Sequence, residues 1–204
     1  GVDSEERGVQ HTALAKKAPL HFRQIGITPE IWVAETEVTQ RQWTAIMGLD
    51  LSAVSGHWEQ AVDDISWCRA LEFANRLSQK EKKEPVYRFR GACESGGKVI
   101  WDEKANGYRL LTEEEWVSLA EQAQSEVMIS ATNNRGVTTV YDNQTPQGDG
   151  LYGLRGNAGE WVWASSQETH SQRANAAAAR NCVNDENCRV LGGQGIRILG
   201  IGFR

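Results

Sequence analysis

The amino-acid sequence predicts a single α+β domain with few regular elements for its length. Helical spacing of apolar residues occurs in separate, short segments. Between these segments lie runs of alternating apolar and polar residues that are typical of strands. After Gln124, residues 125–204 contain many Gly, Asn, Ser and Thr and only short apolar runs, so their backbone groups need partners in short strands or side chains. No internal repeat or linker divides the chain, so we expect an N-terminal arm over residues 1–18 and one domain over residues 19–204.

Strands are expected where apolar and β-branched residues alternate between turn signals. The pair Asn106-Gly107 is a turn signal just before the last of these segments. The expected strands cover residues 21–27, 31–38, 86–89, 99–102 and 108–111.

Two helices are expected in the first half of the chain. Thr39 is suited to cap a helix over residues 40–47, and Gly48 is suited to end it. A second helix is expected over residues 66–78 because its apolar residues fall on one stripe that faces a core. The stripe consists of Trp67, Ala70, Leu71, Ala74 and Leu77.

A third helix has the clearest start signal in the chain. Thr112 and Glu115 have the spacing of a capping box, in which each side chain bonds the backbone N–H of the other residue. Trp116 and Leu119 then begin its buried face. The acidic run 113–115 is explained by the preference of a helix N-terminus for carboxylates, so it does not indicate a catalytic cluster.

Composition narrows the possible partners. The 204 residues carry a net charge of −5, the pI is about 5.5 and the mean hydropathy is −0.52. Nucleic-acid binding is not expected, since it needs a clustered basic surface. No run of residues approaches the ~18 apolar residues that span a bilayer, and residues 1–17 lack the apolar core of a signal peptide. Association with a membrane is therefore expected only through an anchor outside this chain.

The four cysteines do not form the framework of a disulfide scaffold in a chain of this size. Cys68 is interpreted as a small buried hydrophobic residue on the second helix, and Cys93 lies in a Gly-rich turn. Cys182 and Cys188 flank a polar loop that a disulfide would close in an oxidising compartment. The sequence leaves open whether that bridge forms.

Several ordered blocks resemble the formylglycine-generating enzyme and sulfatase-modifying superfamily. The most recognisable is Tyr108-Arg-Leu-Leu-Thr-Glu-Glu-Glu-Trp116. The resemblance implies a C-type-lectin-like fold of the formylglycine-generating type. The other blocks are residues 35–43, 62–67, 73–78, 146–161, 189–193 and 202–204.

The resemblance does not extend to the chemistry of the enzymes. Their copper site uses a cysteine pair that follows the block matching residues 189–193, whereas residues 194–204 contain no cysteine. A thiolate is the soft ligand that copper needs. The related iron-dependent sulfoxide synthases need a His-x-x-x-His-x-Glu-like set, and the four histidines here have no such grouping. We therefore expect no copper and no enzymatic activity.

The variable proteins of diversity-generating retroelements, one branch of this superfamily, resemble the chain more closely. They end at or near Gly-Phe-Arg, as residues 202–204 do, after a segment of variable sequence. The resemblance implies a scaffold over residues 19–161 and a variable ligand-binding segment over residues 162–204. One departure is that only residues 194–201 separate the 189–193 block from the end motif.

The expected function is therefore ligand binding by a diversified surface, displayed on the cell surface or outside the cell. The expected ligand is a protein or glycan on another surface. Trp161 is assigned to the core, and Trp163 is equally compatible with a core position and a ligand contact, since both share one face of a strand. The predicted ligand contacts are Trp163, Ser165, Glu168, His170, Gln172, Asn175, Gln194, Ile196 and Ile198.

A calcium site is implied by the resemblance at Gly156, Ala158 and Glu160, where one carboxylate and two main-chain carbonyls suit a hard cation. Gly153 stands where the family has an asparagine ligand. The alternative is that Glu160 bonds backbone amides in a turn.

Two other functions stay open. One is a metal-dependent oxidase of the formylglycine-generating type whose cysteines lie outside this chain. The other is a structural interaction domain with an invariant partner.

Overall fold

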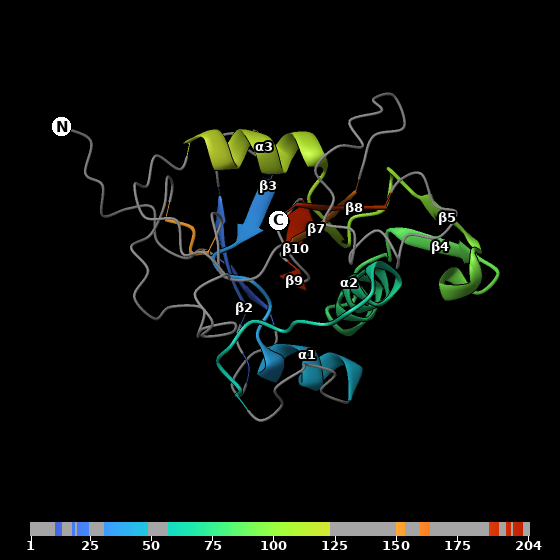
Figure 1. Ribbon diagram of the computed structural model, residues 1–204, viewed down its shortest axis with the longest axis horizontal. Helices are drawn as coiled ribbons and strands as arrows, with labels where there is room; N and C mark the ends of the chain where they lie inside the picture. Colours follow the sequence, from blue (N-terminus) through green and yellow to red (C-terminus); the bar gives the residue numbers. More distant parts are fainter. Residues whose placement is uncertain are drawn as a thin grey trace.

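The computed structural model describes residues 11–13, 18, 20–24, 31–48, 57–122, 150–153, 160–163, 188–191, 195–196 and 198–201. Within these ranges the chain has the predicted mixed α+β character, with short strands and helices joined by irregular segments (Figure 1). No helix among them is long and apolar enough to cross a membrane.

The largest sheet is antiparallel and contains strands from both ends of the chain. Its order is β1-β2-β3-β10-β6. Leu199 in the last strand of the chain pairs with Val33 on one side and with Arg109 on the other. The strands are β1 (His11–Ala13), β2 (Leu20–Gln24), β3 (Ile31–Ala34), β10 (Ile198–Ile201) and β6 (Tyr108–Leu110).

This sheet changes the predicted boundaries in two places. The expected N-terminal arm over residues 1–18 contains β1, which pairs with β2 through His11 and Phe22. The segment 162–204, expected to be the variable surface, supplies β10 to the interior of the sheet. The scaffold therefore includes backbone from the last residues that the structure describes, and it does not stop at residue 161.

The other described strands form two smaller sheets. β4 (Tyr87–Arg90) and β5 (Lys98–Trp101) form a hairpin at one end of the molecule (Figure 1). β7 (Glu160–Trp163) lies between β8 (Cys188–Leu191), which is antiparallel to it, and β9 (Gly195–Ile196), which is parallel.

The three helices begin where the sequence predicts. Thr39 caps α1 (Gln40–Met47) with a capping box, and Gly48 ends it at a φ of 83°, which glycine adopts without strain. Ser66 caps α2 (Trp67–Lys80). Thr112 and Glu115 form the predicted capping box of α3 (Glu113–Gln122), with N···O distances of 2.8 and 3.2 Å.

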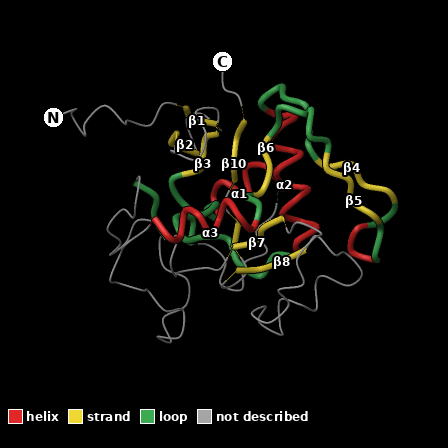
Figure 2. Tube along the Cα trace, turned by 90° about the horizontal axis from the view of Figure 1, so that it is seen from above, coloured by secondary structure: helices red, strands yellow, loops and turns green. Residues whose placement is uncertain are grey.

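The large sheet separates two hydrophobic cores, since successive residues of a strand point to opposite faces. Trp32 and Ala34 of β3 enter the large core with α1 and α2, and Val33 enters the small core. Figure 1 shows α3 on the opposite side of the sheet from α1, and Figure 2 shows the same elements from above. The small core contains Val33, Leu111, Leu119, Leu151 and Val162, with Ile31 and Trp116 packed against it.

The predicted core tryptophans Trp43 and Trp67 are confirmed. Both side chains are fully buried, and the Trp43 ring stacks on Phe73 with 5.3 Å between the ring centroids. Leu119 is also buried as predicted, whereas Trp116 is only partly buried at the edge of the small core.

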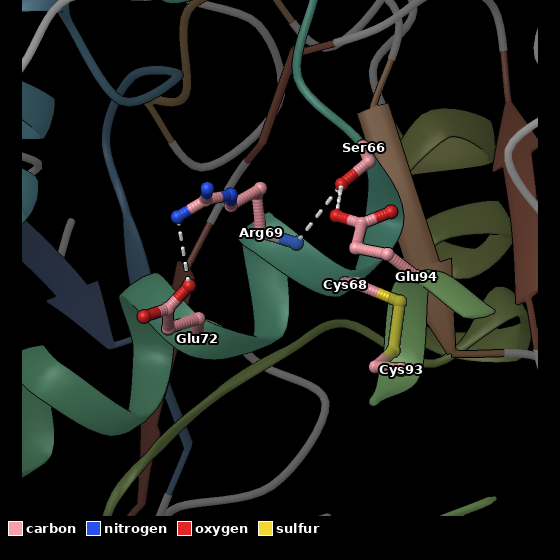
Figure 3. Close-up of a disulfide and its surroundings, with 6 residues drawn as sticks. All are labelled: Ser66, Cys68, Arg69, Glu72, Cys93 and Glu94. Atoms are coloured by element: carbon pink, nitrogen blue, oxygen red, sulfur yellow. Dashed lines mark hydrogen bonds and ion pairs between the residues drawn. A yellow bond between two sulfur atoms is a disulfide. The ribbon is translucent and has the colours of Figure 1, made fainter. Parts of the chain in front are cut away.

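The interpretation of Cys68 as a simple buried hydrophobic residue was wrong. Cys68 is buried at the start of α2, but it forms a disulfide with Cys93, with 5.8 Å between the two Cα atoms. The bridge ties α2 to the loop that joins β4 to β5 (Figure 3). Cys182 lies outside the described residues, so its bridge to Cys188 stays a prediction.

Candidate ligand-binding face

Strand β7 sends successive side chains into opposite cores. Trp161 and Trp163 belong to the large core, and Val162 belongs to the small core. The buried indoles are bonded: Trp161 Nε1 donates to the carbonyl oxygen of Ile65 at 2.9 Å, and Trp67 Nε1 donates to that of Val162 at 3.3 Å. The core assignment of Trp161 is therefore confirmed.

Trp163 belongs to a cluster of four packed aromatic rings, which we call the aromatic floor. The cluster consists of Trp67, Tyr87, Trp101 and Trp163. Its ring centroid is 5.5 Å from that of Trp67 and 5.4 Å from those of Tyr87 and Trp101. The residue is only 9% exposed. This placement corrects the prediction that Trp163 is a ligand contact, because its surface is used by neighbouring rings.

The aromatic floor also holds a polar contact. The backbone N–H of Leu110 donates to the Tyr87 hydroxyl oxygen at 2.9 Å. Burial raises the pKa of this hydroxyl above its ordinary value, so it stays protonated at neutral pH.

Both ends of the segment 164–187 lie beside this floor. Trp163, which precedes the segment, pairs with Cys188, which follows it. The backbone N–H of Trp163 also donates to the carbonyl oxygen of Leu111 at 2.9 Å. The residues on the two sides of segment 164–187 are therefore paired with each other in one sheet.

The other predicted contacts fall into two groups. Ile196 pairs with Trp161 in β9, and Ile198 pairs with Leu110 in β10, so their backbones belong to sheets. The remaining contacts lie outside the described residues: Ser165, Glu168, His170, Gln172, Asn175 and Gln194.

A surface cavity of about 490 Å³ adjoins the aromatic floor. Trp101 connects the two, since its ring meets Trp163 on one side and lines the cavity on the other. Arg88 and Asp102, which form an ion pair, also line it, together with Arg90 and Lys104. We did not predict these residues; the only signal in the sequence is the alternation of arginine with aromatic residues over 87–90.

An ion pair of buried Arg109 with partly buried Glu115 lies next to the aromatic floor, at Trp101. Arg109 is 4% exposed, and its guanidinium lies 4.9 Å from the ring centroid of Trp101. Its two terminal nitrogens bond the two carboxylate oxygens of Glu115, both at 2.7 Å. Burial alone would raise the pKa of the Glu115 carboxyl, but Arg109 and the bonds with Thr112 together lower that pKa below its usual value.

The predicted calcium ligands are only partly described. Glu160 is 1% exposed, and its Oε2 atom accepts a hydrogen bond from Trp116 Nε1 at 2.5 Å. This carboxylate is thus bonded to an indole of α3, a contact that the sequence did not predict. Gly156 and Ala158 lie outside the described residues. Among the residues that the structure describes, no group of three or more His, Cys, Asp and Glu could hold a metal ion.

The chain has a relative among known proteins by sequence comparison. No family model matches the chain. A protein named chaperone protein LppX, from Paenibacillus barcinonensis, is 27% identical over 174 residues. The match covers 66% of this chain, and the chain spans only 62% of the length of that relative.

Two solved structures share the fold. Treponema denticola variable protein 1 superposes with a TM-score of 0.61 and 19% sequence identity, over 93% of this chain and 91% of that protein. A second structure, CarF, has a TM-score of 0.57 and 20% identity over 88% of each chain. At these identities the comparison establishes a common fold.

Proposed function

We propose that this protein is a non-catalytic ligand-binding protein of C-type-lectin-like fold, whose C-terminal segment is diversified by a retroelement. The observation that carries the proposal is the fold shared with a variable protein over 93% of the chain. The pairing of Trp163 with Cys188 adds to it, since both ends of residues 164–187 are held at one point.

The strand pairing supports a proposed location for the diversity, between Trp163 and Cys188. Loop residues carry few packing obligations, so changes between two fixed strand ends leave the scaffold intact. β8 and β10, by contrast, are paired in sheets. We therefore assign the diversified contacts chiefly to residues 164–187, with the aromatic floor as their rigid support.

The ligand is proposed to be a protein or glycan on another surface. A net charge of −5 disfavours nucleic acid. The disulfide between Cys68 and Cys93 supports display outside the cytoplasm, since such bonds persist in oxidising compartments. Attachment to a cell surface would use an anchor outside this chain.

Calcium is proposed as a structural ion held by Glu160 and the carbonyls of Gly156 and Ala158. A ligand that binds only the folded state stabilises it by mass action, so added calcium should raise the melting temperature and a chelator should reverse the rise. Glu160→Gln should abolish the calcium-dependent part. A melting temperature indifferent to calcium and chelator, in the wild-type chain, would exclude the site.

The diversification is tested by sequencing several copies of the gene from related cells. We expect substitutions at adenine-containing codons within residues 162–204, concentrated in 164–187, and an unchanged sequence elsewhere. Copies that are identical in this segment would instead support an interaction domain with an invariant partner.

A second candidate function is binding of another polypeptide during its folding. The observation that favours it is the 27% identity to a protein named as a chaperone. Suppression of light scattering by a heat-unfolded test protein would support this role. Oxygen consumption in the presence of added copper would support the oxidase alternative, which residues 194–204 do not favour because they contain no cysteine.

A further inference from the structure

The outer edge of β4 carries backbone groups that point away from β5. Asp102 donates its backbone N–H to the carbonyl oxygen of Val86 at 2.8 Å, so these two residues form a hydrogen-bonded pair of the hairpin. Hydrogen-bonded pairs alternate with non-hydrogen-bonded pairs along an antiparallel ladder, so Arg88 with Ile100 is the next hydrogen-bonded pair. The peptide N–H and C=O groups of Tyr87 and Phe89 therefore face outward.

At Tyr87 a side chain from α2 takes the place of a neighbouring strand. Asn75 Nδ2 donates to the Tyr87 carbonyl oxygen at 2.6 Å, and the Tyr87 N–H donates to Asn75 Oδ1 at 3.0 Å. No described residue provides the same pair of bonds for Phe89, two residues further on. Phe89 is also 38% exposed, although it is a large hydrophobic residue.

Beyond Asn75 an open groove of about 380 Å³ separates α2 from β4, with Phe89 on its wall. Arg69 and Glu72 line the α2 side. Cys68, Cys93 and Glu94 also line the groove. Figure 3 shows the disulfide between Cys68 and Cys93 and the hydrogen bond from Ser66 to Glu94. Among the described residues, none pairs with the outer edge of β4 at Phe89, so this side of the groove presents main-chain N–H and C=O groups.

We propose that this groove binds a short extended peptide of a partner protein, which adds to the edge of β4 at Phe89. One peptide residue would exchange two main-chain hydrogen bonds with Phe89, as in other cases of strand addition. Its side chain would share the apolar face of Phe89, because paired residues of neighbouring strands point to the same side.

The charged side chains of β4 and β5 indicate which residues should flank the apolar residue of that peptide. The two neighbours of the paired residue point to the opposite face, where Arg88 and Arg90 lie. Arg90 is directly opposite Lys98, a like-charge pair that destabilises a hairpin. Arg88 is already paired with Asp102, whereas no described acidic side chain forms an ion pair with Arg90 or Lys98. The groove therefore fits a peptide in which an acidic residue beside Arg90 neighbours the apolar residue, and this inference does not depend on residues 164–187.

The probe is the peptide acetyl-Ser-Glu-Val-Glu-Ser-amide, added to the full 204-residue chain and followed through backbone amide NMR signals. Binding should move the Phe89 amide signal and slow its hydrogen exchange, while amides of β10 stay unchanged. The matched control is acetyl-Ser-Lys-Val-Lys-Ser-amide, which should bind at least several-fold more weakly because its charges repel Arg90.

Two variants separate the main-chain bonds from the side chain. Phe89→Pro removes the N–H that faces the groove, at an edge position where proline is tolerated, and should weaken binding about tenfold. Phe89→Ala retains that N–H and should weaken binding less. Arg90→Gln should weaken the binding of the acidic peptide about threefold.

Three results would overturn the proposal. The first is that the acidic peptide leaves the Phe89 amide unchanged at millimolar concentration. The second is that a folded Phe89→Pro variant binds as well as the wild type. The third is that both peptides bind equally. If Phe89→Pro does not fold, hydrogen exchange of the wild-type Phe89 amide still decides the question. Loss of the diversified function would not affect any of these results.

Discussion

The helices α2 and α3 both pack against β7 but are held there by different interactions. α2 places Trp67, Phe73 and Leu77 in the large core, where all three are fully buried. Among the described side chains of α3, Leu119 and Ala120 are the buried ones, and polar contacts also hold the helix in place. The bond from Trp116 to Glu160 joins α3 to β7, and the ion pair of Glu115 with Arg109 joins α3 to β6.

The difference indicates how each side of β7 responds to change. The stabilisation from apolar burial does not depend on pH, and it falls in proportion to the number of buried atoms that a substitution removes. A buried ion pair depends on both partners and on their protonation. We therefore expect the α2 side to be sensitive to cavities and the α3 side to be sensitive to charge.

The largest effect is expected from Trp67→Ala. The substitution removes a fully buried ring and opens a cavity, so the free energy of unfolding should fall by about 4 kcal/mol. Trp58→Ala is the matched control, because Trp58 is 43% exposed and should change stability by about 0.5 kcal/mol or less. Urea unfolding measures both. Equal losses in the two variants would contradict the assignment of the core.

Arg109→Met should be nearly as damaging. It leaves the Glu115 carboxylate buried without its partner, which should cost about 3 kcal/mol. The double variant Arg109→Met/Glu115→Gln keeps a hydrogen-bonding side chain at the helix cap and removes the unpaired charge, so it should recover part of the loss. A double variant less stable than either single variant would mean that the two residues do not act as a pair.

Low pH should lower the free energy of unfolding through Glu115 at the start of α3. The pKa of Glu115 is lowered in the folded state from 4.5, so below that pH the unfolded chain binds more protons than the folded chain. This contribution to stability is present above pH 4.5 and is lost as the pH falls through the lower folded pKa. Glu115→Gln should make the free energy of unfolding less dependent on pH below 4.5, whereas Trp67→Ala should leave the slope of that dependence unchanged. An unaltered acid slope in Glu115→Gln would contradict the origin assigned to it.

The smallest effect is expected from Thr112→Ala, which removes one half of the α3 capping box and should cost about 1 kcal/mol. Thr39→Ala provides the comparison on α1, where the same box is present, and should cost a similar amount. Thermal unfolding measures both. An unchanged melting temperature for Thr112→Ala would mean that the box does not stabilise α3.

Local signals account for the parts of the fold that were predicted. Helix starts at Thr39 and Thr112 depend on side chains a few residues away, so the sequence shows them directly. The cap of α2 at Ser66 was not predicted. The disulfide of Cys68 with Cys93 joins residues 25 positions apart, and neither cysteine has a spacing that identifies its partner.

The candidate face was predicted less completely. The position of Trp163 depends on Tyr87 and Trp101, which come from a distant hairpin, so its strand pattern alone did not distinguish core from contact. Likewise, Arg109 and Glu115 were recognised only as parts of a motif and a helix cap. Their pairing under Trp101 requires the packed structure.

The most direct test of the account is a paired scan of stability and partner binding. Alanine substitutions at Ser165, Glu168 and His170 should alter binding to a partner recovered with the full chain and change the melting temperature little. Trp67→Ala and Leu119→Ala should lower the melting temperature strongly. If the substitutions within residues 164–187 unfold the protein as readily as Trp67→Ala, that segment is part of the core and the ligand-binding account is wrong.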